Sequence, residues 1–231
     1  MRVLVVCAHA DDEVIAIGGT LRKLADADAN IRLLMFSDGA EGYTTSDQKD
    51  AIVAIRNDET KKVCDILGIS EYFNLHGLDW NFKVDNDGYH AVIHHIRQFK
   101  PDLVLTHSKA DYNDHMVVHD VTVEGWFHAG IKCAMSEGDP WNRSALYEFE
   151  VLQAMDKPSV IVDITDTYST KVKAMAIYES QHQIVGSVFQ LIEGRALERG
   201  SQIGVKYGEA VRRNNYRPRG VYDINALSKL L

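Results

Sequence analysis

Cysteine is scarce in this 231-residue chain, which contains only Cys7, Cys64 and Cys133, far apart and without a CxxC pair. A sparse, odd number of cysteines argues against a disulfide scaffold and is typical of a reducing compartment, so we expect a cytoplasmic protein. Long apolar runs are also missing. No stretch approaches the ~18–20 uninterrupted apolar residues of a membrane span, and the first apolar run meets charged residues too soon for a signal-peptide core. These patterns predict no membrane insertion.

An excess of positive charge is absent too. The formal net charge is −8, with 33 acidic against 25 basic residues, which argues against nucleic acid as a partner. Apolar residues make up 45% and charged residues 25%, proportions typical of a folded globular protein rather than of a disordered chain. No internal repeat, low-complexity tract or flexible linker is present, and the length suits one hydrophobic core. We therefore predict a single domain over residues 1–231.

Short apolar runs alternate with longer amphipathic stretches along the chain. This alternation predicts parallel βαβ units, and thus a Rossmann-like α/β domain with a mostly parallel sheet and helices on both faces. The strands are expected over residues 2–8, 31–36, 72–75, 102–106, 146–152 and 159–164. The helices are expected over residues 18–26, 46–67, 89–99, 114–133, 170–182 and 188–198.

The ionisable residues gather where three of these strands end. Segments 9–13, 37–42 and 107–119 follow the first, second and fourth strands. Ligands of open parallel sheets bind beyond the carboxyl ends of the strands, so this geometry brings the three segments together. His9 and Asp12 are three residues apart in the first segment, and a turn can direct both at one metal ion. Zinc accepts imidazole and carboxylate ligands, and the segment D-Y-N-D-H at 111–115 can supply the third.

A nucleotide-binding turn is the competing interpretation of the first segment. Gly18 and Gly19 follow the acidic cluster, but the GxGxxG pattern is absent. Adjacent carboxylates would also repel a pyrophosphate group. The sequence therefore favours a metal site over a dinucleotide site.

The same residues carry a family resemblance. A-H-A-D-D-E at 8–13 with I-G-G at 17–19 resembles the A-H-P-D-D-E signature of the LmbE-like, or PIG-L, family of zinc-dependent N-acetylsugar deacetylases. N-D-H at 113–115 is similar to the end of that family's second motif, H-P-D-H. Weaker similarities are Arg56-x-x-Glu59, Thr106-His107, Tyr178-x-Ser180-Gln181 and Gly204-x-x-Tyr207-x-Glu209.

The resemblance implies a role for each matching residue. His9, Asp12 and His115 correspond to the family's zinc ligands, and Asp11 to the aspartate that acts as general base. Zinc lowers the pKa of a bound water and polarises an amide carbonyl. A carboxylate beside that water can take its proton and pass it to the leaving amine.

Two positions depart from the family pattern. Ala10 replaces the usual proline, and Tyr112 stands where the family has a histidine that steadies the oxyanion. A phenol can donate one hydrogen bond to an oxyanion, so Tyr112 can take this role. If the loop is one residue short, the role falls to His107 instead. His119 is a rival metal ligand, because it lies four residues after His115 on one helical face.

Three further residues are candidates for substrate binding. Arg56 lies beside the apolar stripe of its helix, and either contacts substrate or forms a structural pair with Glu59. Asp38 follows the second strand, and Trp80 follows the third, where an indole can stack on a sugar ring. Arginines within 195–219 form a basic surface or subunit contact, or bind an anionic aglycone.

We predict a zinc hydrolase that removes an N-acetyl group from an amino sugar or sugar conjugate, a small-molecule partner. A metal-dependent amidase acting on a non-sugar metabolite is the first alternative, and a non-catalytic ligand-binding protein is the second. The intact Asp11 argues against the last, because a binding site needs no base. The substrate cannot be read from motif and fold. The sequence is compatible with a homo-oligomer.

Overall fold

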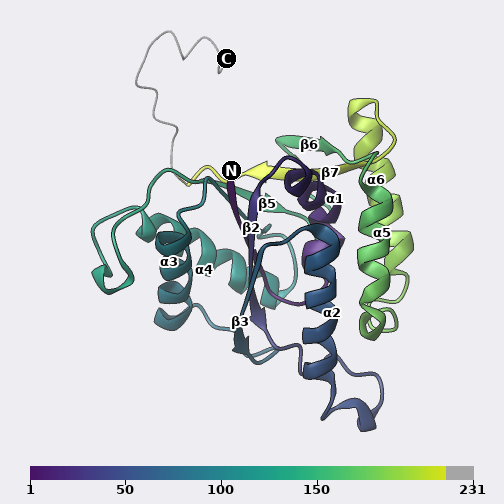
Figure 1. Ribbon diagram of the computed structural model, residues 1–231, viewed down its shortest axis with the longest axis horizontal. Coiled ribbons are helices and arrows are strands. Elements are labelled where there is room, and N and C mark those ends of the chain that lie inside the picture. The colour runs from purple at the N-terminus through teal and green to yellow at the C-terminus, as the bar shows by residue number, and fades with distance from the viewer. Residues whose placement is uncertain (217–231) are drawn as a thin grey trace.

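A computed structural model describes residues 1–216 of the chain. Its centre is a seven-stranded sheet in the order β3-β2-β1-β4-β5-β7-β6, with helices on both faces (Figure 1). The strands are β1 (Arg2–Cys7), β2 (Asn30–Ser37), β3 (Glu71–Gly77), β4 (Leu103–His107), β5 (Ala145–Phe149), β6 (Val160–Asp163) and β7 (Gly208–Arg213).

The five strands from β3 to β5 are parallel, and β7 pairs antiparallel with both β5 and β6. The chain runs outward from β1 to β3 and then returns to place β4 on the other side of β1. The loops that leave β1 and β4 therefore diverge to opposite faces of the sheet. Such a switch point opens a crevice at the carboxyl ends of the two strands.

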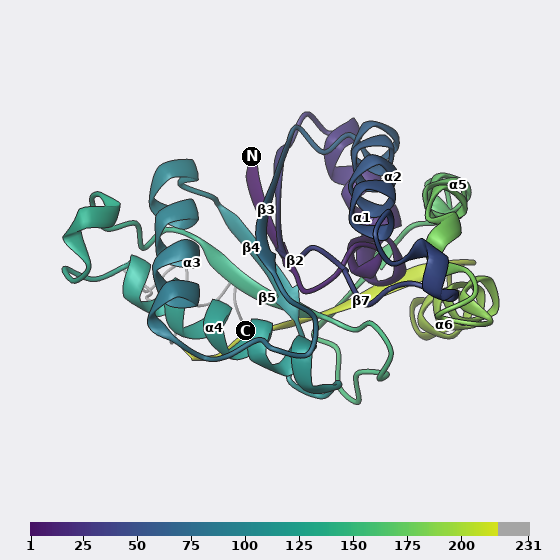
Figure 2. The same ribbon diagram turned by 90° about the horizontal axis from the view of Figure 1, so that it is seen from below.

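Two groups of helices cover the two faces of the sheet. In Figures 1 and 2, α3 and α4 lie on one face, while α1, α2, α5 and α6 lie on the other. Each group has its own cluster of buried apolar side chains against the sheet. The helices are α1 (Asp12–Asp26), α2 (Ile52–Leu67), α3 (Asn86–Phe99), α4 (Asn113–Ala129), α5 (Tyr168–Ile177) and α6 (Val188–Ile203).

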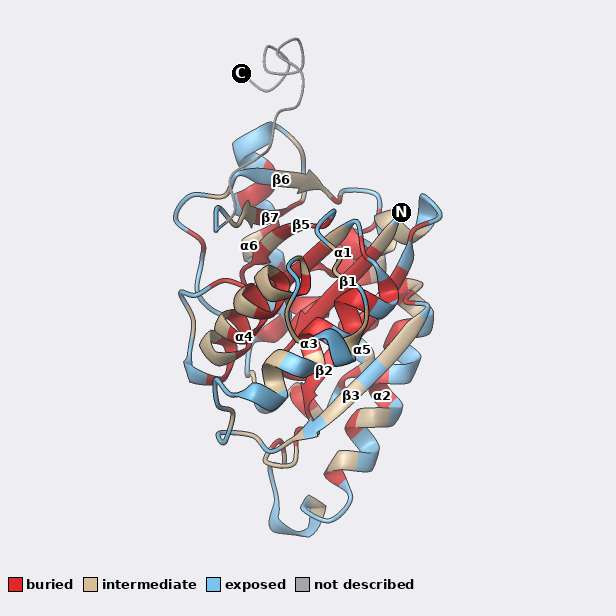
Figure 3. Cartoon of the chain, turned by 90° about the vertical axis from the view of Figure 1, so that its left-hand side faces the viewer, coloured by how far each residue is buried: buried red, intermediate tan, exposed pale blue. Residues whose placement is uncertain are grey.

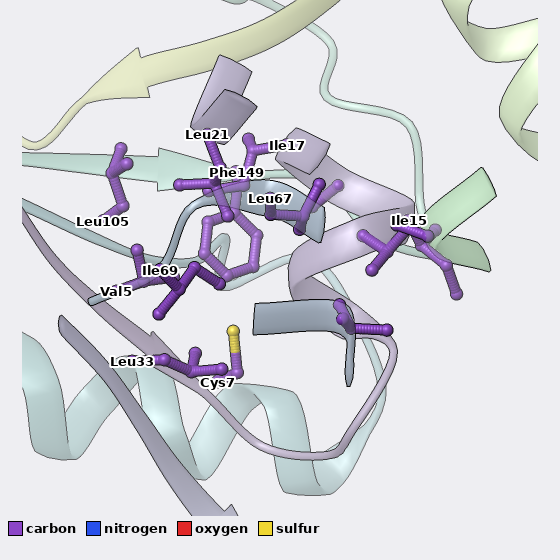
Figure 4. Close-up of a cluster of buried hydrophobic side chains, with 14 of the residues drawn as sticks. Val5, Cys7, Ile15, Ile17, Leu21, Leu33, Leu67, Ile69, Leu105 and Phe149 are labelled. Carbon is purple, nitrogen blue, oxygen red and sulfur yellow. The ribbon is translucent and has the colours of Figure 1, made fainter. Parts of the chain in front are cut away.

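The continuous apolar run of β1 is explained by its central place. Residues 3–7 have no exposed surface, because both faces of a strand inside a doubly covered sheet are buried. Figure 3 shows β1 buried, whereas the edge strand β3 is mainly of intermediate exposure. In Figure 4, Val5 and Cys7 of β1 pack close to Phe149 of β5. This core holds the strand ends in place.

The structure confirms the predicted α/β class, the mostly parallel sheet and the single domain. It also corrects two element boundaries and adds one strand. Helix α1 begins at Asp12 instead of Gly18, and residues 46–48 form a separate 3₁₀ turn before α2. Strand β7 was not predicted, because G-E-A-V-R-R carries too little apolar pattern. No helix among residues 1–216 combines the length and the apolar character that crossing a membrane requires.

Helix α1 is broken in its middle, at Ile17, whose φ of −139° is not helical. The break frees the backbone N–H groups of Gly19 and Thr20, and both donate to the Glu209 carboxylate, at 3.0 and 2.7 Å. Lys171 donates to the same carboxylate and to the carbonyl of Ile15. The I-G-G signature and the late Glu209 thus belong to one structural unit, which orients the start of α1.

Candidate functional site

The segments after β1, β2, β3, β4 and β5 meet around one cavity of about 360 Å³. Its position at the carboxyl ends of the strands agrees with the switch point between β1 and β4. Polar residues on its wall are His9, Asp11, Asp12, Glu41, Arg56, Asp79, Tyr112, His115 and Gln181. Less polar residues on its wall are Ile15, Gly42, Trp80, Val151, Leu152, Ile184 and Val185.

His9, Asp12 and His115 offer donor atoms that all lie within 4.8 Å of one another. Asp12 Oδ1 lies 3.1 Å from His115 Nε2, and Asp12 Oδ2 lies 3.8 Å from His9 Nδ1. All three side chains are buried. Two imidazoles and one carboxylate form a donor set that zinc accepts, and three protein ligands are the usual number in catalytic zinc sites.

His9 is oriented by carboxylates on the side that faces away from Asp12. Its Nε2 lies 3.3 Å from Asp114 Oδ2 and 3.7 Å from Asp79 Oδ1. With the proton on Nε2, the lone pair of Nδ1 is directed at the site. Asp114 also accepts the backbone N–H of Trp80 at 3.0 Å, so it connects the loop after β3 to His9.

The surroundings of His115 show whether the residues of this site fit a metal ion. Both of its ring nitrogens are buried and make no hydrogen bond of good geometry within residues 1–216. Burial lowers the pKa of His115, but the charges of Asp12 and Asp111 outweigh burial and raise it to about 10. In turn, His115 and His107 hold the pKa of Asp12 well below its usual range, against the effect of burial. A buried imidazole whose nitrogens make no well-aligned hydrogen bond, although carboxylates lie beside them, fits a metal ligand.

Asp11 lines the cavity but lies outside the group of close donor atoms. Its φ of 106° is in the left-handed region, which residues other than glycine rarely adopt, so the turn holds it under strain. Its side chain makes no capping bond to α1. Burial, and then repulsion from Asp12, raise the pKa of Asp11 well above its usual range, although Arg56 opposes this. A higher pKa makes the carboxylate a stronger base.

Tyr112 and His107, the two oxyanion candidates, occupy different places. Tyr112 lines the cavity, and its hydroxyl lies 3.0 Å from His9 Nδ1. Burial, and then the charges of Asp12 and Asp11, raise the pKa of Tyr112, so the phenol keeps its proton. His107 is fully buried outside the cavity wall, and its Nε2 accepts the backbone N–H of Ala8 at 2.9 Å. The structure brings only Tyr112 to the cavity.

Arg56 reaches the cavity and does not pair with Glu59 within residues 1–216. Its guanidinium donates to the carbonyl of Ala10 at 2.8 Å, while its Nε is buried without a partner. A Cβ at Gly39 or Gly42 would approach this guanidinium to 2.5 or 2.3 Å and would displace it, and Gly39 also has a φ of +66°, which favours glycine. Arg56 therefore supports the loop after β1 at the wall of the cavity.

Three residues of the weaker family motifs make contacts within the fold, namely Glu59, Tyr178 and Ser180. Glu59 accepts hydrogen bonds from the backbone and hydroxyl of Ser180, at 3.0 and 2.6 Å. The Tyr178 hydroxyl donates to Glu13 at 2.6 Å, and burial raises the pKa of Glu13 to about 7. These bonds fasten the segment after α5 to α1 and α2. As a result, the neighbouring Gln181 lies in the cavity wall.

The two remaining substrate candidates differ in position. Trp80 lies at the cavity, and 73% of its surface is exposed, which leaves its ring face accessible. Asp38 does not line the cavity, contrary to our expectation, because it contacts His76 and Asn74 on the outer side of the loop.

Asp79 is a residue of the cavity wall that sequence reasoning missed. Its carboxylate lines the cavity, bonds to Ser37 and accepts the backbone N–H of Glu41 at 2.8 Å.

His119 and the late arginines lie away from the cavity wall. His119 contacts Glu148 at 3.3 Å, and Arg212 also bonds to Glu148. Arg199 bonds to the buried Glu150. Arg199 and Arg212 therefore pair with carboxylates of the segment around β5, outside the cavity that His9, Asp12 and His115 line. Arg217 and Arg219 lie outside the described residues.

Comparison with known proteins identifies the family. A family model described as PIG-L, GlcNAc-PI de-N-acetylase, matches residues 4–126, just over half of the chain. The chain belongs to the PIG-L family. The match includes both expected ligand segments of this PIG-L protein, around His9 and around His115.

The relatives of this PIG-L protein are deacetylases. Diacetylchitobiose deacetylase of Thermococcus kodakarensis is 29% identical over 226 residues, which cover 91% of this chain and 82% of that protein. The solved structure of N,N'-diacetylchitobiose deacetylase from Pyrococcus horikoshii has a TM-score of 0.86 at 25% identity. That alignment covers 96% of this chain and 88% of the other.

The fold also occurs with another activity. The structure of GalB, the 4-carboxy-2-hydroxymuconate hydratase of Pseudomonas putida KT2440, has a TM-score of 0.81 at 22% identity. The alignment covers 96% of this chain and 99% of that chain. At this identity the likeness concerns the fold alone, so the reaction has to be argued from the site.

Proposed function

We propose that this protein is a zinc-dependent N-deacetylase, which hydrolyses the acetamide of a sugar that contains N-acetylglucosamine. The observation that carries the proposal is the buried donor set of His9, Asp12 and His115, with Asp11 free beside it in the same cavity. The names of the family and of the relatives support an N-acetylated sugar as substrate. Trp80 at the mouth of the cavity offers an aromatic face for a sugar ring.

The reaction breaks the amide C–N bond and adds water to the carbonyl carbon. Zinc, when bound by His9, Asp12 and His115, supplies a Lewis acid that lowers the pKa of water and polarises the carbonyl. Asp11 takes a proton from the attacking water and delivers it to the nitrogen of the leaving amine. Acetate and the free amino sugar are the products.

Two further residues act on the substrate in this proposal. Tyr112 keeps its proton and donates a hydrogen bond to the developing oxyanion, because its hydroxyl lies beside His9 Nδ1. Arg56 lines the cavity, which suits its guanidinium to a contact with the substrate. His107 supports the site from behind, with its Nε2 3.4 Å from Asp12 Oδ2.

The decisive experiment measures acetate release by the metal-loaded protein. N-acetylglucosamine, N,N'-diacetylchitobiose and a set of non-sugar acetamides should be compared at equal concentration. We expect release from at least one of the sugars, loss of that release when a chelator removes zinc, and its return when zinc is added back. Hydrolysis of the non-sugar amides alone would favour the amidase alternative. Tight zinc binding without any release would favour the binding-protein alternative.

The cellular setting belongs to the same proposal. The three cysteines are free, and Cys7 and Cys64 are buried. Because reduced thiols are usual in a reducing compartment, we propose that the enzyme works in the cytoplasm on a small-molecule substrate. Fractionation of cells that express the protein, followed by detection in the soluble and membrane fractions, tests this assignment.

A further inference from the structure

Asp111 lies between the proposed metal ligand His115 and one wall of the cavity. Its Oδ2 atom is 3.4 Å from His115 Nδ1, and its side chain is only 4% exposed. The same oxygen accepts hydrogen bonds from the backbone N–H groups of Leu152, at 3.1 Å, and Gln153, at 3.4 Å. Its other oxygen accepts the N–H of Tyr112 at 2.8 Å. One carboxylate therefore contacts helix α4 and the loop after β5.

The loop after β5 is part of the cavity, since Val151 and Leu152 line it. On its outer side the loop is held by α6, where Arg195 donates to the carbonyl of Leu152 at 3.2 Å. Arg199 also bonds to the buried Glu150 at 2.6 Å. On its inner side, the amides at 152 and 153 are held by Asp111. The order of this wall thus depends on the Asp111 carboxylate.

We propose that Asp111 is a positioning residue, which holds His115 for the metal ion and couples metal binding to the order of the cavity wall. The inference rests on the proposed function. A histidine ligand keeps its orientation when its second nitrogen faces a carboxylate, and loss of that carboxylate lowers metal affinity ~10- to 100-fold. A metal ion that restrains His115 also restrains Asp111 and the two amides bonded to it. Coupling between two sites is reciprocal.

The chain offers a matched control for the first test. Asp120 is also on α4 and also contacts a histidine, His119 Nδ1 at 2.8 Å, but neither residue lines the cavity. Zinc affinity of the full-length protein should be measured by competition with a chelator. We expect Asp111→Asn to bind zinc ~10- to 100-fold more weakly, and Asp120→Asn to bind as the wild type does. Unchanged affinity in Asp111→Asn would overturn the positioning role.

Hydrogen exchange tests the coupling without relying on activity. In the wild type, zinc loading should slow exchange of the amides at Leu152 and Gln153. In Asp111→Asn, zinc should leave their exchange unchanged. If the variant does not fold, the comparison of zinc-free and zinc-loaded wild type still decides, because equal exchange there would overturn the coupling. A wild type that binds no zinc would instead overturn the proposed function, which separates the two failures.

Discussion

Asp11 shows at the residue scale how two adjacent carboxylates acquire different roles. Asp12 points at His115 and carries a lowered pKa, whereas Asp11 sits in a left-handed turn and carries a raised one. A charge paired with imidazoles suits a metal ligand, and a carboxylate in the cavity with a raised pKa suits a base. These different surroundings are the reason why we propose Asp12 as a metal ligand and Asp11 as the base.

The substitution Asp11→Asn should keep zinc and cut kcat by ~10²-fold or more, because the amide cannot accept the proton of water. Zinc content by elemental analysis and acetate release should be measured on the same sample. Loss of zinc would make Asp11 a ligand. Full turnover would remove the base from the mechanism.

Tyr112→Phe removes one hydroxyl at the position where the family has a histidine. We expect kcat to fall by roughly one to three orders of magnitude while KM changes little, because the lost bond is made in the transition state. The test measures kcat and KM of two variants, Tyr112→Phe and His107→Ala, by steady-state kinetics. A fall in kcat confined to the His107 variant would transfer the role to His107.

At the element scale, the broken helix α1 depends on a residue nearly 200 positions away. Glu209 of β7 caps the two N–H groups freed by the break and pairs with Lys171 at 2.6 Å, all in a buried setting. Breaking a buried pair by removing one partner costs several kcal/mol, because it leaves a charge uncompensated.

Glu209→Gln should therefore lower the free energy of unfolding by ~3 kcal/mol. Chemical denaturation monitored by circular dichroism measures the change. The exposed Glu193→Gln on α6 is the control for loss of a carboxylate, and we expect a change within about 0.5 kcal/mol there. Equal stability of the two variants would show that the cap contributes nothing.

At the scale of the whole molecule, the pair of β5 and β7 carries an acid-sensitive contact. Glu148 is buried and accepts hydrogen bonds from His119, Arg212 and Asn214. Burial raises the pKa of Glu148, but these bonds, that of His119 first, lower it from 4.5 to about 2. The folded state therefore releases this proton more readily than the unfolded state does.

The contribution of Glu148 to the free energy of unfolding should be fully present above about pH 4.5. It should be lost as the pH falls toward 2. The contribution is on the order of 3 kcal/mol, the free-energy equivalent of that difference in pKa. Unfolding of wild type and Glu148→Gln should be compared from pH 6 to pH 2. The difference between them should shrink below pH 4.5, and a constant difference would contradict the assignment.

Much of this molecule could be predicted from local pattern. The buried strands β1, β2 and β4 are recognisable as apolar runs, and the acidic cluster after β1 indicates a metal site by its residue types and their spacing. Strand β7 was missed, because its segment carries little apolar pattern and its charged residues Glu209 and Arg212 bond to Lys171 and Glu148, far away in the sequence. The local pattern of apolar and polar residues does not show which distant residues pair.

The amino-acid sequence by itself determined the class of fold, the family and the small set of residues from which a metal site can be built. The resemblance already favoured His115, and the tertiary structure places it beside His9 and Asp12, whereas His107 and His119 lie outside the cavity wall. The tertiary structure also brought Asp79, Asp111 and Asp114 to the site, where they orient ligands and loops. The physical reason is that their partners are backbone amides and imidazoles of other segments, which meet only when the sheet has formed.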